Sequence, residues 1–157
     1  MAVEHQTVKE MWKKYLSIMG ENINVTAKTY ESWYFCNHEK DANECAELVK
    51  KGTKKATASL HCLYEIENEP IPKVGDYVII TNWKGIAQCI IQITNIHTIP
   101  FKEVTTEFAA REGEGDKTLS FWRKVHRKFF TLELREHDKN FSEDMLVICE
   151  EFEVVYN

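Results

Sequence analysis

The chain has 157 residues, of which 43% are hydrophobic and 29% charged, so its length suits one domain with its own core and its composition excludes an intrinsically disordered protein. The formal net charge is −5, which argues against sequence-independent binding to a long polyanion, because such binding draws its affinity from many lysines and arginines. No apolar run is long enough for a signal peptide or a membrane span, so we expect a cytoplasmic protein without a membrane partner.

The cysteines of the chain show no CxxC pair, and no histidine follows them at zinc-finger spacing. They are Cys36, Cys45, Cys62, Cys89 and Cys149. An odd, scattered set is typical of reduced thiols in a cytosolic core. For the chain as a whole we expect no metal and no cofactor. A nucleophilic cysteine would need surroundings that stabilise its thiolate.

The N-terminal residues predict an amphipathic helix. Apolar side chains recur at helical spacing over residues 8–19, and Gly20 follows where a helix commonly ends. We expect residues 1–29 to form a helical extension of a single domain that spans residues 1–157.

A second helix is predicted after an aromatic-rich stretch. Residues 22–38 carry too many aromatic side chains for a flexible linker and suit an extended, packed segment. Asp41 and Glu44 fit a capping box, with Asp41 as the N-cap of a helix that ends at Gly52.

The central part of the chain reads as strands. Residues 56–61 alternate between apolar and hydroxyl or polar side chains, which is the period of a half-buried strand. Residues 73–76 predict a tight turn into a strand over 77–81. Residues 83–85 predict a hairpin-like connection into a long apolar strand over 86–96.

A helical region is predicted next, interrupted by glycines. Residues 104–109 suit a short helix, after which Gly113 and Gly115 break the pattern. Asp116 is then expected to cap a further helix. That helix carries along one side Leu119, Trp122, Val125 and His126.

Two more strands are expected over residues 129–134 and 145–156. About six strands with a few short helices between them, and without a repeating βαβ rhythm, indicate an α+β fold with a curled or closed mixed sheet.

The segment from Gly52 to Ser59 offers a first chemical group. Lys54 and Thr57 can converge across a glycine-led turn, where the lysine could donate to a phosphate or carbonyl, or act as a base on the threonine hydroxyl. The alternative is a pair of solvated lysines that protects a strand edge from aggregation.

The segment from Arg111 to Asp116 offers a second group. Glu112, Glu114 and Asp116 lie within a few residues of one another and alternate with glycines. Carboxylates that share a cleft raise one another's pKa and could serve in acid–base chemistry or accept hydrogen bonds from a base. The run lacks the spacing of a calcium loop, and its glutamates could equally be solvated.

Residues 117–128 are basic and contain no acidic side chain. Trp122 and His126 are neighbours on one helical face, so the helix could stack on a base and contact a phosphate. The alternative places Trp122 in the core above a solvated cationic face. The cations are Lys117, Arg123, Lys124, Arg127 and Lys128.

Taken together and in this order, these segments resemble the ASCH (activating signal cointegrator homology) domain family. The resemblance covers roughly residues 30–155. The matching stretches are residues 33–36, 42–51, 52–59, 73–76, 104–109, 112–116, 121–122, His126 and 129–130.

The resemblance implies a PUA-like fold, a small mixed β-barrel with flanking helices. It also implies that the start of the strand at Gly52 to Ser59 faces the loop from Glu112 to Asp116 across a cleft. Many members of the family are expected to bind RNA or a nucleotide.

A binding module for RNA, a nucleoside or a nucleotide is therefore the first functional hypothesis. In this hypothesis Lys54, with Arg123 and its basic neighbours on the same helix, meets phosphate and Trp122 stacks on a base. One of Glu112 and Glu114, with Asp116 beside them, reads an exocyclic amine.

Two enzymatic hypotheses stand beside it. Some relatives are amidohydrolases of N-acylated cytidine nucleosides with a lysine, a threonine and a glutamate as catalytic residues, which the resemblance places on Lys54, Thr57 and Glu114. A ribonuclease would use His126 and Lys54 as acid and base.

Overall fold

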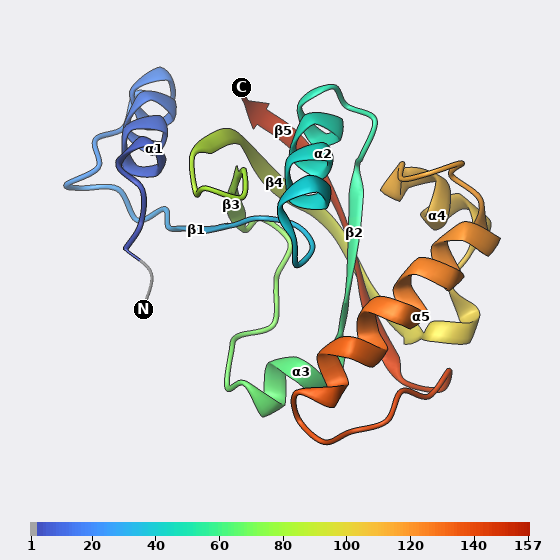
Figure 1. Ribbon diagram of the computed structural model, residues 1–157. Helices are drawn as coiled ribbons and strands as arrows, with labels where there is room; N and C mark the ends of the chain where they lie inside the picture. The colour runs from blue at the N-terminus through green and yellow to red at the C-terminus, as the bar shows by residue number, and fades with distance from the viewer. Residues whose placement is uncertain (1–2) are drawn as a thin grey trace. The chain divides into compact units, whose positions relative to one another are not determined.

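The computed structural model describes residues 3–157, in which helices are interspersed with strands along the chain (Figure 1). Within these residues no helix has both the length and the apolar character that a membrane span requires. The helices are α1 (Gln6–Ile18), α2 (Glu39–Lys50), α3 (His61–Ile66), the 3-10 helix η1 (Phe101–Glu103), α4 (Thr106–Glu112) and α5 (Leu119–Arg135). The strands are β1 (Tyr30–Trp33), β2 (Ala56–Leu60), β3 (Tyr77–Thr81), β4 (Ala87–Pro100) and β5 (Leu146–Tyr156).

The strands belong to one mixed sheet with the order β1-β3-β4-β5-β2. β1 pairs with β3 in parallel, whereas β3 pairs with β4 and β2 pairs with β5 in antiparallel fashion. The α+β class with a mixed sheet and flanking helices is thereby confirmed. The described sheet has five strands rather than about six, because one predicted strand is helical.

The chain divides into two compact units, which we describe separately. The first contains the chain up to Gly52 together with Gly75–Ile93 and Phe152–Asn157, and the second contains Thr53–Val74 and Thr94–Glu151. The single-domain organisation over residues 1–157 stays a prediction.

The core of the first unit forms against α1 and α2. The predicted N-terminal helix is present, and its buried stripe, which includes Trp12 and Leu16, packs against Ile79 of β3 and Ile90 of β4. Gly20 follows with a φ of +74°, the left-handed conformation that commonly ends a helix.

The start of α2 corrects the predicted capping box. His38 is the N-cap, and Asp41 lies inside the first turn, where its carboxylate is 2.7 Å from His38 Nε2. An acidic side chain in the first turn interacts favourably with the helix dipole, so Asp41 still marks this end of the helix without capping it. Ala42, Cys45, Ala46 and Val49 form the buried side.

The core of the second unit is built around α5. The strand predicted over residues 129–134 is wrong, because these residues continue the helix to Arg135. Their buried members extend the stripe begun by Trp122 and His126 at a spacing of four residues, which is a helical period. The residues buried on this side are Trp122, His126, Phe130 and Leu134.

The start of α5 also differs from the prediction. Thr118 is the N-cap, and its hydroxyl accepts from the Phe121 amide at 3.1 Å. Asp116 instead accepts from the Thr118 amide at 2.9 Å and from its hydroxyl at 2.6 Å, so it supports the capping residue. The short helix α3, which follows β2 directly, was not predicted.

Candidate functional site

The loop after α4 lies directly against the start of β2, and both belong to the second unit. The Lys55 amide donates to the Arg111 carbonyl at 2.7 Å. Gly113 ends α4 with a φ of +69°, and a Cβ added there would lie 2.3 Å from the Thr53 carbonyl oxygen. Only glycine fits this approach of two backbones. The two segments that the sequence singled out therefore meet.

Lys54 is buried beneath this loop. Its side chain is 1% exposed, and its Nζ lies 3.0 Å from Glu112 Oε1 and 3.2 Å from Glu114 Oε2. The interpretation of two solvated lysines therefore holds for Lys55, which is exposed, and is wrong for Lys54. An ammonium group leaves water only where anionic partners replace its hydration, and here two carboxylates do so.

Glu112 is the hub of the buried charges. Lys54 donates to Oε1, and Oε2 accepts from Trp122 Nε1 and lies 3.1 Å from His126 Nε2. Burial alone would raise the pKa of this carboxyl group. The charges of Lys54 and His126, with the hydrogen bonds from His126 and Trp122, outweigh that effect and lower the pKa of Glu112 to about 2.

His126 is held in its cationic form. Its Nδ1 lies 2.9 Å from the Trp122 carbonyl oxygen, which can only accept, and its Nε2 faces the ionised Glu112. Both ring nitrogens therefore carry protons. Burial lowers the pKa of His126, but the charge and hydrogen bond of Glu112 raise it above the ordinary value.

Trp122 positions these groups from within the core. The side chain is buried, its ring stacks on that of His126 with centroids 4.1 Å apart, and it packs against Phe101 with centroids 5.3 Å apart. The expectation that Trp122 stacks on a base is therefore not supported, because no face of the ring is open.

Glu114 and Thr57 are the more accessible members of the predicted set. The Glu114 side chain is 24% exposed, and Thr57 is half-buried on β2, where it pairs with Glu150 of β5. The sequence left Glu112 and Glu114 as alternatives. The structure separates them, because Glu112 is buried as a hub whereas Glu114 reaches solvent.

The remaining predicted residues lie around this centre. Asp116 is exposed beside Thr118, which helps to lower the pKa of Asp116 through its side-chain and backbone hydrogen bonds. Arg123 donates from Nη2 to the Lys102 carbonyl at 3.1 Å, and its Nε is buried without a hydrogen-bond partner.

The cluster also presents a possible cation geometry. One ligand atom each from Glu112, Glu114 and His126 lie within 4.8 Å of one another. The Lys54 ammonium already bonds to both carboxylates, so a metal ion would have to displace it. The positive charges of Lys54 and His126 balance the negative charges of Glu112 and Glu114 in this cluster.

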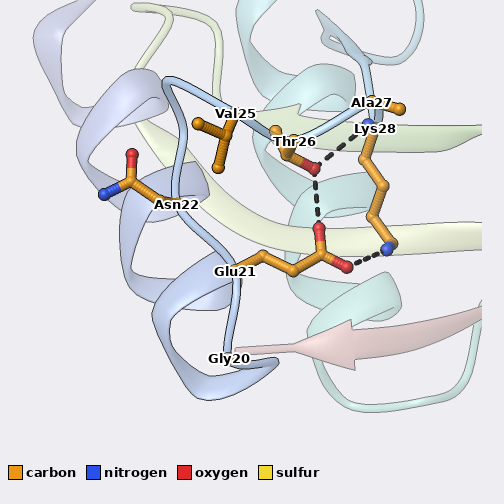
Figure 2. A pocket seen from close by; sticks show the side chains of 7 residues that line it. All are labelled: Gly20, Glu21, Asn22, Val25, Thr26, Ala27 and Lys28. Atoms are coloured by element: carbon orange, nitrogen blue, oxygen red, sulfur yellow. Dashed lines mark hydrogen bonds and ion pairs between the residues drawn. The ribbon is translucent and has the colours of Figure 1, made fainter.

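A second region lies in the first unit, in a stretch where the sequence indicated no functional residues. Figure 2 shows a hollow lined by residues 20–22 and 25–28 of the loop after α1. The Glu21 carboxylate accepts from the Thr26 hydroxyl at 2.6 Å and pairs with Lys28 (Figure 2). None of the predicted site residues lines this hollow.

Known proteins place the chain in a family. No curated protein matches it. An ASCH domain from Lactobacillus crispatus JV V101 is 38% identical, with a TM-score of 0.89 over 98% of this chain and 97% of that one. A protein from Enterococcus faecalis V583 is 32% identical, with a TM-score of 0.86 over 96% of this chain and 89% of that one.

A more distant structure, of a hypothetical protein, is 23% identical, with a TM-score of 0.54 over 81% of this chain and 100% of that one, and shows a likeness of fold alone. The model of the ASCH domain matches residues 31–156. The coverage of that match and the identity to the Lactobacillus domain show that this chain belongs to the ASCH domain family, with a PUA-like fold.

Proposed function

We propose that the protein is a binding module for RNA or a nucleotide, and that Glu114 reads the base. The observation that carries this proposal is the partly exposed Glu114 carboxylate, whose Oε2 is fixed by the buried Lys54 Nζ at 3.2 Å. The PUA-like fold of the ASCH family, which is often proposed to bind RNA, supports the same class of ligand.

The buried charges make Glu114 a preorganised acceptor. Lys54 is itself held by Glu112, which Trp122 and His126 hold in turn. A carboxylate kept in place accepts hydrogen bonds without first losing side-chain freedom. Carboxylates accept from the exocyclic amine of cytosine, and single-stranded RNA presents such edges for recognition.

Phosphate contacts are assigned to the exposed side of α5. Lys124 and Lys128 are exposed there, whereas Arg127 pairs with Glu143 and lies over the Phe101 ring at 5.7 Å. Lys54 is too buried to meet a phosphate, so its role is to hold Glu114. With a net charge of −5, the protein suits a short or single-nucleotide ligand better than a long duplex.

Titration of the purified protein with cytidine, uridine and short single-stranded RNAs tests the proposal. We expect cytidine to bind more tightly than uridine, which lacks the exocyclic amine. Glu114→Gln should weaken cytidine binding by about ten-fold or more, because a hydrogen bond to a charged acceptor is lost. Glu107→Gln on α4 is the matched control, since Glu107 is exposed and the charge change is the same.

Two outcomes of this titration would contradict a specific role of Glu114 in binding. Equal affinities of Glu114→Gln and the unchanged protein, at equal melting temperatures, would overturn it. A loss of binding in Glu107→Gln as well would show that only the net charge matters.

An amidohydrolase is the second candidate, and the direct contact between Lys54 and Glu114 favours it. In that reaction the Thr57 hydroxyl would attack the acyl carbon of an N-acylated cytidine and pass its proton to Lys54. The proton taken up by Lys54 would pass through the Glu114 carboxylate to the amine as the carbon–nitrogen bond breaks. Water would then cleave the acyl ester on Thr57, returning a proton to the threonine oxygen and releasing the acyl group as a carboxylic acid. The two carboxylates beside Lys54 favour its charged form, which cannot act as a base, so binding is the better-supported function.

Mass detection of deacylated cytidine separates the two candidates. Turnover that disappears in Thr57→Ala would establish the hydrolase. Cytidine binding without turnover would eliminate it. A ribonuclease is not favoured, because His126 is buried and both of its ring nitrogens are engaged.

A further inference from the structure

Two cysteines of the first unit lie side by side although the sequence separates them. Cys36 follows β1, Cys45 lies in α2, and their Sγ atoms are 3.8 Å apart. We propose that this pair is a modification site at which a hydroperoxide forms an intramolecular disulfide. The proposal does not depend on nucleotide binding.

The local structure allows the two sulfur atoms to close. A disulfide requires about 2.0 Å between them, so the pair must approach by somewhat less than 2 Å. Residues 35–38 form bends outside helix and strand, so closure needs a local change in this segment and none in α2. Cys45 is fixed in the buried side of α2.

The two thiols differ in exposure, which assigns them different roles. Cys36 is partly exposed and can meet a small oxidant, whereas Cys45 is 3% exposed and lies behind it. Reactive cysteines are accessible ones with a resolving thiol nearby. Cys36 is therefore the attacked residue and Cys45 the resolving residue.

The other cysteines lack this combination. Cys89 and Cys149 are buried, and burial raises the pKa of each thiol to about 12, so the reactive thiolate is scarce. Cys62 is partly exposed, like Cys36, and provides an internal comparison.

The reaction balances with the peroxide as the named oxidant. The Cys36 thiol gives up its proton and the thiolate attacks a peroxide oxygen. The oxygen–oxygen bond breaks, Cys36 becomes a sulfenic acid, and the other peroxide oxygen takes that proton and leaves as water or an alcohol. The Cys45 sulfur then attacks the Cys36 sulfur, the sulfur–sulfur bond forms, and the sulfenic oxygen leaves as water. Two electrons pass from the two sulfurs to the peroxide.

The cross-link would fasten the segment after β1 to α2. Phe35, next to Cys36, is buried in the same core cluster as Cys45. A covalent link reduces the freedom of the unfolded chain, so the oxidised protein should melt at a higher temperature than the reduced one.

Peptide mapping after peroxide treatment tests the proposal. Cleavage after lysine places Cys36 in residues 29–40 and Cys45 in residues 41–50, so the disulfide joins two otherwise separate peptides. We expect that joined peptide, with a mass two hydrogen atoms lower than the sum of its parts. Alkylation after denaturation should label three of the five cysteines rather than all of them.

Matched variants complete the test. Cys62→Ser should form the joined peptide as the unchanged protein does, and Cys36→Ser should not. A joined peptide that contains Cys62, disulfide-linked dimers, or a sulfinic acid on Cys36 without a link to Cys45 would overturn the proposal. Cys36 is the partly exposed member of the pair, so we expect Cys36→Ser to fold, and its melting temperature under reducing conditions checks this.

Discussion

Two glycine-led turns of this chain, at Gly20 and at Gly113, each place a glutamate against a lysine. In the loop of residues 20–28, Glu21 and Lys28 are each 30% exposed. In the turn at Gly113, the side chains of Glu112 and Lys54 are 2% and 1% exposed. The same pair of residue types thus occurs once in contact with solvent and once inside the core.

The comparison teaches that the groups around an ion pair, more than its two residue types, decide how much the pair matters for stability. Glu21 accepts hydrogen bonds from Lys28 and Thr26, which lower the pKa of Glu21, and its side chain is partly open to solvent. Glu112 has no water to rely on, so a lysine, a histidine and an indole satisfy it. Removing such a buried carboxylate destabilises the fold, because the positive charges around it stay buried without a counter-charge.

Glu112→Gln is expected to have the largest effect. The substitution removes the charge that compensates His126 and half of that around Lys54, so it should lower the free energy of unfolding by about 3–5 kcal/mol. Urea denaturation at neutral pH measures the loss.

Glu21→Gln is the matched control from the exposed loop, and its denaturation midpoint should barely change. Equal losses in the two variants would contradict the distinction between the two pairs. The double variant Lys54→Met/Glu112→Gln should lose less free energy of unfolding than the sum of the losses in the two single variants, because both members of the pair are removed together.

Acid should weaken the buried pair over a defined range. The pKa of Glu112 is lowered from 4.5 to about 2 in the folded protein, so its contribution is complete above pH 4.5 and is lost as the pH falls toward 2. The shift corresponds to about 3 kcal/mol. His126 has a raised pKa and behaves oppositely: its contribution is complete below its ordinary pKa and is lost as the pH rises through its value in the folded protein.

The free energy of unfolding of the unchanged protein and of Glu112→Gln, measured at a series of falling pH values, isolates the contribution of Glu112. The other carboxyl groups titrate in both proteins, so their effect cancels in the difference. The difference between the two stabilities should shrink with falling pH. A difference that stays constant would show that Glu112 is not ionised in the folded state.

The two glycines provide the smallest of these tests. Gly20→Ala and Gly113→Ala both place a side chain at positive φ, which costs about 1–2 kcal/mol. A Cβ at Gly20 meets nothing within 4 Å, whereas one at Gly113 would overlap the Thr53 backbone. Thermal unfolding should therefore show a larger loss for Gly113→Ala, and equal losses would argue against the close approach.

Much of the local structure could be predicted from the sequence. The stripe of α1, the glycine that follows it and the strand β2 arise from local patterns, and all three are confirmed. The burial along β2 does not alternate: Ala56 and Leu60 are buried, and the three residues between them are partly buried. Residues 129–134 misled the prediction, because a short aromatic and apolar run suits a strand as well as a helix. The helical period becomes clear only when the buried residues of this run, Phe130 and Leu134, are taken together with Trp122 and His126 before it.

The sequence predicted which residues lie in the candidate site better than it predicted what each residue does there. The family resemblance paired Lys54 with Glu112 and Glu114, and the structure brings these three side chains together. The sequence left two positions open for Trp122, stacked on a base or packed in the core, and the structure shows the second. The contact between Cys36 and Cys45 could not be foreseen, since it depends on how separate elements pack.

The sequence by itself determined the periodicities, the positions that need glycine and the residue types available for chemistry, because these follow from neighbours along the chain. The tertiary structure decided that Lys54 is buried while Lys55 is exposed, and that Glu112 is a hub while Glu114 faces solvent. A charge can be buried only where distant residues replace its water, and packing alone brings α4 and α5 to the start of β2.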